Sequence, residues 1–337
     1  MYTLLYAIAV TLTAAALQAA TPTPVIFDTD MGNDVDDALA LAMLHAFQSD
    51  GKCTIIAVTS TKDHPLSVAY CDALNTFYGR PEILLGAVRN GVTRDVGRFN
   101  ALVEKKEGDK LIYPHKQTGE TVPDAVCVLR QALAKEADHS VAVIQVGFSS
   151  NLARLLDTPA DEYSPLSGKE LVAQKVKVLS IMGGAFQTIV NNENPYTEYN
   201  IKMDVPAAQK LVNNWPGRIV FSGFEIGIAI PYPAQSIVDD YNYVAHHPVK
   251  DAYIAYIPPP HNRPTWDLTS ALYAVCPDDG YFGLSAPQKV SFSDTGFTQF
   301  KHDKNGKHFY LTVSPEQIQR VTALFVQVCP RKPHVQK

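Results

Sequence analysis

The stretch that decides the fold is an apolar run, an acidic loop and an apolar helix pattern in direct succession, and it reads Val25-Ile26-Phe27-Asp28-Thr29-Asp30-Met31-Gly32-Asn33-Asp34-Val35-Asp36-Asp37-Ala38-Leu39-Ala40-Leu41-Ala42-Met43-Leu44. The apolar run is typical of a buried strand, and the segment rich in alanine and leucine is typical of a helix. The carboxylates between them are therefore expected at the carboxyl end of a strand, where open α/β sheets bind their ligands.

Five aspartates fall within the ten residues 28–37. So many like charges are unfavourable together unless a positive group lies among them, and a divalent cation with oxygen ligands is the simplest such group. The same acids would also suit proton transfer. The alternative is a helix start decorated with acids for the helix dipole. Capping explains one or two acids, but it does not explain a set that begins inside the strand.

Outward from this stretch, strand-like and helical patterns alternate along the chain. This order predicts an α/β fold in which one open, mostly parallel sheet is flanked by helices, with a Rossmann-like core over residues 24–330. Turn signals and alternation over about 281–313 predict a small antiparallel addition at the C-terminal end. Two loops, 97–120 and 253–264, are expected at the rim of a site. The expected strands are 25–27, 54–59, 141–146, 176–182 and 218–222, and the expected helices are 37–47, 65–78, 124–134, 151–156 and 205–213.

The composition narrows the class of ligand. The chain has 337 residues, 46% of them hydrophobic and 19% charged, which provides ample material for a large core. Its net charge of -5 argues against nucleic acid and against an anionic membrane surface, because both select a basic face. A small neutral or cationic ligand fits better.

The N-terminal residues 1–20 form an apolar stretch that ends in small residues, which predicts a secretory signal peptide although no Lys or Arg precedes it. A secreted or periplasmic protein, without stable membrane association after cleavage, is therefore expected. The alternative is an uncleaved anchor. Five scattered cysteines lack the spacing of a zinc site. Cys276 with Cys329 is a candidate disulfide, while buried thiols are expected for most of them.

Beyond the acidic stretch, further blocks follow in order along the chain, and together with it they resemble the inosine-uridine-preferring nucleoside hydrolases over about residues 25–275. The Asp-x-Asp strand end and the Asp36-Asp37-Ala38 helix start resemble that family's N-terminal signature. The other matching blocks are Val58-Thr59-Ser60, the 145–153 turn, Ile181-Met182-Gly183-Gly184, the segment from Asn192 through Glu198-Tyr199-Asn200 to Asp204, and Trp266-Asp267.

The resemblance implies a Ca²⁺-dependent hydrolase of the N-glycosidic bond of ribonucleosides, with one ion per site and a homodimer or homotetramer as its assembly. The metal ligands that it implies are Asp30, Asp37, the carbonyl of Ser150 and Asp267. Asp30 would also accept the proton of the attacking water. The residues expected to bind the nucleoside are Asp36, Asn192, Glu198, Asn200, Trp266 and Asp267.

The sequence departs from the family pattern at three places, one of which, Phe148-Ser149 in place of a Pro-Leu pair, is a modest change in a turn. Five residues, 31–35, separate Asp30 from the Asp36-Asp37 pair where the family usually has three, so Asp34 is a rival for one of the acidic roles. Trp266 stands where nonspecific members carry a His proposed as the acid for the leaving base. A Trp resembles the purine-preferring members, and an aromatic stack favours a base that gains positive charge.

Three other residues are candidates for contact with the substrate, namely Asp63, His64 and His261. A helix cap before Pro65 is an equal interpretation of the first two. Two other functions stay open from the sequence. The Phe27-Asp28-Thr29-Asp30 order also resembles a phosphatase of the haloacid dehalogenase type, and a secreted nucleoside- or sugar-binding protein without turnover would carry similar residues.

Overall fold

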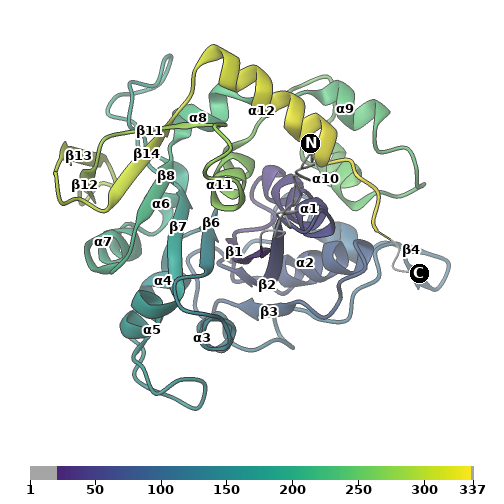
Figure 1. Cartoon of the computed structure of the whole chain (residues 1–337). Coiled ribbons are helices and arrows are strands. Elements are labelled where there is room, and N and C mark those ends of the chain that lie inside the picture. Colours follow the sequence, from purple (N-terminus) through teal and green to yellow (C-terminus); the bar gives the residue numbers. More distant parts are fainter. Residues whose placement is uncertain (1–20, 335–337) are drawn as a thin grey trace, which may run out of the picture.

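A computed structural model describes residues 21–334, and the predicted signal peptide, 1–20, lies outside the described residues. A ten-stranded sheet forms the centre of the molecule (Figure 1). Its strands run in the order β13-β12-β14-β8-β7-β6-β1-β2-β3, with β11 paired to β14. All pairings from β14 to β3 are parallel, whereas β11, β12 and β13 pair antiparallel. The predicted mostly parallel sheet is therefore confirmed.

The strands of this sheet are β1 (Thr23–Thr29), β2 (Cys53–Ser60), β3 (Leu84–Ala87), β6 (Val141–Gln145), β7 (Val176–Met182), β8 (Ile219–Ser222), β11 (Gly283–Leu284), β12 (Gln288–Phe292), β13 (Thr298–His302) and β14 (His308–Thr312). The antiparallel addition predicted for 281–313 is present, but one part of it differs. Strand β14 pairs parallel with β8 and so extends the main sheet. Two short pairs, β4 (Lys106–Glu107) with β5 (Lys110–Leu111) and β9 (Pro231–Tyr232) with β10 (Arg263–Pro264), lie outside it.

Alternation along the strands supplies a core on each face of the sheet. Val25 and Phe27 of β1 belong to one buried cluster, and Ile26 belongs to the other. The first cluster includes residues of α1 (Asp36–Ser49), α2 (Pro65–Phe77), α10 (Pro248–Tyr256), α11 (Trp266–Val275) and α12 (Pro315–Val328). The second includes residues of α3 (Ala125–Lys135), α4 (Ser150–Leu155), α5 (Gly168–Lys175) and α7 (Val205–Asn214). Helices thus cover both faces, as a parallel sheet requires.

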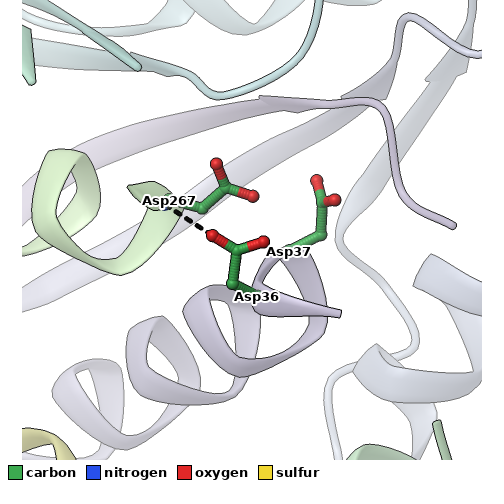
Figure 2. A group of neighbouring side chains, drawn as sticks. All are labelled: Asp36, Asp37 and Asp267. Atoms are coloured by element: carbon green, nitrogen blue, oxygen red, sulfur yellow. Dashed lines mark hydrogen bonds between the residues drawn. The ribbon is translucent and has the colours of Figure 1, made fainter. Parts of the chain in front are cut away.

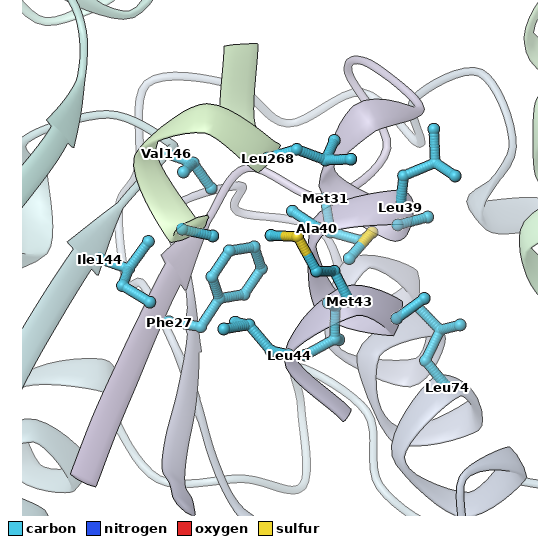
Figure 3. Packing of buried hydrophobic residues seen from close by; sticks show 14 of the residues in the cluster. Phe27, Met31, Leu39, Ala40, Met43, Leu44, Leu74, Ile144, Val146 and Leu268 are labelled. Atoms are coloured by element: carbon cyan, nitrogen blue, oxygen red, sulfur yellow. The ribbon is translucent and has the colours of Figure 1, made fainter. Parts of the chain in front are cut away.

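Helix α1 lies against β1 through apolar side chains. Figure 3 shows Phe27 of β1 beside Met43 and Leu44 of α1, with Met31 of the connecting loop nearby. All four are fully buried. At roughly 1.5–3 kcal/mol for each such side chain, this packing fixes where α1 begins. The shorter elements are η1 (Asn100–Glu104), α6 (Tyr199–Met203), α8 (Phe224–Ala229) and α9 (Ala234–Asp239).

The five cysteines are all free thiols, so the candidate pair Cys276 and Cys329 does not form a disulfide. All but Cys127 are buried, as expected for small apolar side chains. Within the described residues, no helix combines the length and apolar character needed to cross a membrane.

Candidate functional site

A cavity of about 510 Å³ lies where the carboxyl ends of the central strands meet the first turns of α1 and α11. Its wall includes Val146, just after β6, and Met182 at the end of β7. The acidic loop after β1 supplies much of the rest of the wall. The cavity therefore occupies the place at which parallel sheets bind ligands.

Three carboxylates face one another at this cavity: Asp36, Asp37 and Asp267 (Figure 2). One oxygen of each lies within 4.8 Å of the others. The backbone N–H of Asp267 donates to Asp36 Oδ2 at 3.0 Å, and the Thr29 hydroxyl donates to Asp37 Oδ1. Asp37 Oδ2 is buried and has no hydrogen-bond partner among the described residues. A free carboxylate oxygen beside two others fits a divalent cation.

The first turns of two helices hold these acids, but the acids do not cap them. The N-cap residue of α1 is Val35, and no side-chain hydrogen bond caps that helix. Asp36 and Asp37 follow in its first turn, and Asp267 lies in the first turn of α11. The helix dipoles favour negative charge at both places. Side-chain capping therefore does not account for these acids, whereas their place in the first turn is the one that the helix-dipole alternative expects.

Burial and mutual repulsion disfavour the ionised form of the three carboxylates. Burial is the largest cause that raises the pKa of Asp36, Asp37 and Asp267 well above the ordinary value. The neighbouring carboxylates raise it further, Asp34 acting on Asp36 and Asp30 on Asp37. Carboxylates that resist ionisation in this way need a positive partner to be charged together at neutral pH.

Asp30 lines the same cavity next to the cluster. Its Oδ2 accepts a hydrogen bond of 2.6 Å from Asn33 Nδ2, and Asn33 Oδ1 accepts one of 2.6 Å from Lys62 Nζ. Lys62 is fully buried and also pairs with Asp95 at 2.8 Å. Burial raises the pKa of Asp30 to about 6, although the Asn33 hydrogen bond and the Lys62 charge act against that rise. The Asp30 carboxylate is thus fixed in position by a hydrogen bond and can accept a proton near neutral pH.

Glu198 and Asn200 lie at one wall of the cavity, both buried. Glu198 is the N-cap of α6 and accepts from the backbone N–H groups of Asn200, Ile201 and Gly184 at 2.8, 3.1 and 3.3 Å. Burial raises the pKa of Glu198 to about 7. Asn200 Nδ2 donates to the Val146 carbonyl at 2.7 Å, which directs the amide toward the cavity. A carboxylate and an amide fixed in this way match the hydroxyl groups of a sugar.

Three aromatic side chains also line the cavity, namely Trp266, Phe224 and Tyr256. The Trp266 ring stacks on Phe224 with centroids 5.2 Å apart, and its Nε1 donates to the Phe224 carbonyl at 2.9 Å. The Arg263 guanidinium lies over both Trp266, at 5.1 Å, and Tyr256, at 4.7 Å. Such a wall suits a planar heterocycle with polar edges.

Asp34 does not join the cation cluster. Its carboxylate forms two hydrogen bonds with Arg263, one of them from Nε at 2.8 Å. Burial alone would lower the pKa of Arg263, but the Asp34 carboxylate outweighs it and raises that pKa. Asp34, the rival of the Asp36-Asp37 pair, is therefore an ion-pair partner of Arg263 at the cavity and lies beside Asp36.

Five of the residues expected at the site lie outside the lining of this cavity. The Ser150 hydroxyl donates to Asp204, and Asn192 is exposed with its amide donating to the Val190 carbonyl at 3.2 Å. His64 is the N-cap of α2 and accepts from Leu66 N, as the capping alternative requires. The other two are Asp63, which accepts from Gly91 N and pairs with Arg94, and His261, which contacts the Pro258 carbonyl.

Sequence reasoning missed several residues of the cavity. Arg263 contacts the aromatic rings, and Val146 contributes a carbonyl next to Asn200. Lys62 is fully buried and is not among the lining residues, but it donates to Asn33, which in turn donates to Asp30. Tyr256 and Arg263 fall within the predicted rim loop 253–264, but that range is not all loop, because Tyr256 ends α10 and Arg263 lies in β10. Gly97 and Arg98 come from the other predicted loop, 97–120. The loops were thus detectable, but their individual side chains were not. Asp28 belongs to none of these groups, because it bonds Thr59 and Asn151 inside the sheet.

Comparison with known proteins agrees with this geometry. A model of the family described as inosine-uridine preferring nucleoside hydrolase matches residues 25–278. A pyrimidine-specific ribonucleoside hydrolase RihA from Shewanella sp. (strain ANA-3) is 26% identical over 264 residues, 74% of each chain.

Two solved structures share the fold. The plant nucleoside hydrolase PpNRh1 has a TM-score of 0.69 at 20% identity, covering 92% of this chain and 99% of its own. A purine-preferring ribonucleoside hydrolase from Gardnerella vaginalis has a TM-score of 0.68 at 19% identity, covering 91% and 98%. The resemblance drawn from the ordered motifs is confirmed, and the chain belongs to the inosine-uridine preferring nucleoside hydrolases, enzymes that cleave the N-ribosyl bond of nucleosides.

Proposed function

We propose that this protein hydrolyses the N-glycosidic bond of ribonucleosides to ribose and free base with Ca²⁺ as its cofactor. The observation that carries the proposal is the buried cluster of Asp36, Asp37 and Asp267, which presents an unpartnered oxygen to a cavity shared with Glu198 and Trp266. Family membership supports the reaction class and argues against the phosphatase alternative.

The donor set favours a hard cation over a softer one, and the resemblance to the family supports Ca²⁺. The cluster offers carboxylate oxygens only, which is the chemistry of a hard cation. Ca²⁺ takes six to eight oxygens, so these carboxylates with a nearby carbonyl would leave positions for water and for two sugar hydroxyls. When bound, such an ion lowers the pKa of water and anchors the sugar. The resemblance implies Asp30, Asp37, Asp267 and the Ser150 carbonyl as its ligands. Asp36, expected to bind the nucleoside, lies in the cluster with Asp37 and Asp267, so these three would hold the ion with Asp30 beside them.

The chain's own residues would activate the water, bind the ribose and stabilise the transition state. Asp30 accepts the proton of the attacking water, because it lines the cavity and titrates near neutral pH. Glu198 and Asn200 hold the ribose hydroxyls in a fixed orientation. The ionised carboxylates around the sugar stabilise the positive charge that develops on the ring in an oxocarbenium-like transition state.

We also propose a preference for purine bases, carried by the Trp266 and Phe224 stack. A large aromatic surface stabilises a two-ring base more than a one-ring base. The named relatives differ on this point, because RihA is described as pyrimidine-specific and the Gardnerella enzyme as purine-preferring.

One assay tests the proposed reaction. The purified protein is incubated with inosine, uridine and p-nitrophenyl phosphate, each with Ca²⁺ and with a chelator, and ribose, base and phosphate are quantified. We expect ribose and hypoxanthine from inosine, a lower kcat/KM for uridine, and loss of both activities with the chelator. Phosphate release would indicate a phosphatase. Binding of inosine without ribose release would indicate a binding protein.

Secretion and self-association are further parts of the proposal. The apolar residues 1–20 support export with cleavage near Ala19 or Ala20, which N-terminal sequencing of the exported protein would test. A homodimer or homotetramer follows from the resemblance to the family, and light scattering on the purified protein would test it. A monomer at micromolar concentration would contradict the assembly.

A further inference from the structure

The aromatic rings of the cavity are accompanied by an arginine and, among the described lining residues, by no histidine. Among the described residues that line the cavity none is a histidine, and His261 is held near the Pro258 carbonyl instead. The positive groups in the lining are Arg263 and Arg98. An enzyme that expels a base from C1′ must stabilise the electron pair left on the base nitrogen, so these guanidiniums are the groups to consider.

Arg263 is held in place from three directions. Asp34 binds it through both carboxylate oxygens, and the Tyr256 and Trp266 rings lie 4.7 and 5.1 Å from its guanidinium carbon. Its side chain is 15% exposed. A guanidinium held by these three neighbours is preorganised. Preorganisation is what makes a hydrogen-bond donor effective in a transition state.

The longer acidic loop explains how this arrangement is built. Residues 31–35 place Asp34 beside Asp36 and within hydrogen-bond distance of Arg263, in β10. The two partners lie 229 positions apart in the sequence. The extra loop length therefore supplies a counter-ion for Arg263.

We propose that Arg263 is a catalytic residue that donates hydrogen bonds to the departing base, and that Asp34 is its positioning residue. This inference rests on the proposed nucleoside hydrolysis. In the step concerned, the C1′–N bond breaks and its electron pair goes to the base nitrogen. The water oxygen forms the new bond to C1′ and gives its proton to Asp30. The base takes a proton from solvent, and Asp30 returns one to solvent.

Arg263 acts as a donor and keeps its proton. A guanidinium stays protonated at any working pH, so it cannot serve as a general acid. Its contribution is electrostatic and grows with the negative charge on the leaving group. A nucleoside with a poor leaving base depends on it strongly, whereas a p-nitrophenyl riboside, whose phenolate leaves unaided, depends on it little.

The test compares Arg263→Ala with wild type on inosine and on p-nitrophenyl riboside, in Ca²⁺. We expect kcat/KM for inosine to fall by about 10²–10³-fold, the loss measured for a single preorganised donor, and kcat/KM for the riboside to fall by less than about 10-fold. Added guanidinium ion should restore part of the inosine activity. Asp34→Asn should show the same selective loss with a smaller size, because it loosens Arg263 without removing it.

Arg98→Ala is the matched control, since Arg98 lies over the same Tyr256 ring at 4.8 Å and forms no salt bridge with a described residue. It should change both substrates by a similar factor. Equal losses on both substrates in Arg263→Ala, or the same selective loss in Arg98→Ala, would overturn the assignment. Thermal melts and Ca²⁺ titrations verify that each variant is folded. A wild-type protein that cleaves neither substrate would refute the proposed function itself, which is a different result.

Discussion

At the scale of single residues, the free oxygen of Asp37 is the feature on which activity depends. Asp37→Asn keeps the size of the side chain and its bond with Thr29 but removes one buried charge. We expect kcat on inosine to fall by about 10²-fold or more and the Ca²⁺ affinity to fall with it, while the protein stays folded.

The matched control is Asp63→Asn, because Asp63 follows the neighbouring strand and lies outside the cavity. Its activity should equal that of wild type within about 2-fold, because Asp63 does not line the cavity and the amide keeps an oxygen that can accept from Gly91 N. Steady-state rates and calorimetric Ca²⁺ titration measure both quantities. Full turnover in Asp37→Asn would contradict the cation assignment.

Also at this scale, Lys62 controls the ionisation of Asp30 through Asn33. Its charge lowers the pKa of Asp30, so Lys62→Met should raise that pKa. Asp30 must be ionised to accept a proton, and the acidic limb of the kcat/KM profile should therefore move to higher pH. Asp95→Asn, which removes the other partner of Lys62, should not move it upward. An unchanged limb in Lys62→Met would show that another group controls this titration.

At the scale of elements, two loops close against each other at the cavity mouth. The Arg98 N–H donates to the Gly32 carbonyl at 2.8 Å, and a Cβ on Gly97 would lie 2.5 Å from that oxygen. Gly97→Ala should therefore push the loop outward and raise KM several-fold. Gly108→Ala is the control, because Gly108 also has positive φ but nothing lies within 4 Å of its Cβ position. Gly108→Ala should lose about 1–2 kcal/mol of stability through its positive φ alone, and Gly97→Ala should lose more because of the added contact. A KM change in Gly108→Ala would contradict this explanation.

The long elements could be predicted from the sequence because their patterns are local. The expected strand 176–182 coincides with β7, and the expected helix 65–78 ends one residue beyond α2. Strand β3 has only four residues, Leu84–Ala87, which is too short for alternation to stand out. The parallel pairing of β14 with β8 joins segments far apart in sequence, so turn signals near 281–313 could not reveal it.

The candidate site was predictable to the extent that its residues fall in continuous motifs. Asp36, Asp37 and Asp267 come from the first turns of two helices, and the order of the motifs brought them to one site. Arg263 and Lys62 are different, because each matters only through a partner brought close by the fold. Local sequence spacing indicates neither the pairing of Asp34 with Arg263 nor that of Asn33 with Lys62, because the partners lie far apart in the sequence.

At the scale of the whole molecule, the buried acids link stability to pH and to the cation. Burial raises the pKa of Asp28 and Glu198 to about 7 and that of Asp30 to about 6 in the cation-free protein. Unfolded carboxylates titrate near about 4. Between about pH 4 and pH 7 the folded chain therefore holds more protons than the unfolded chain, and these acids lower stability as pH rises.

Two histidines act in the opposite direction, so Tm alone does not isolate the acids. Burial lowers the pKa of His45 and His247 to about 3, well below their ordinary value. Each therefore adds stability as pH rises from about 3 to about 6.5. These histidines are not among the residues that line the cavity, and a cation bound there leaves their contribution almost unchanged. The useful quantity is the difference in Tm between Ca²⁺ and chelator at each pH.

We expect that difference to grow between about pH 5 and about pH 7.5, because Ca²⁺ binds only the ionised carboxylates and protons compete with it. At a Ca²⁺ concentration of about 100 times Kd the gain is about 2.7 kcal/mol, or on the order of 5 °C in Tm. Differential scanning calorimetry with Ca²⁺ or chelator at both pH values measures it. Asp37→Asn should remove most of the difference at the higher pH while keeping the contribution of both histidines. A Tm difference that is equal at the two pH values would mean that the cation binds at groups already ionised, outside the buried cluster.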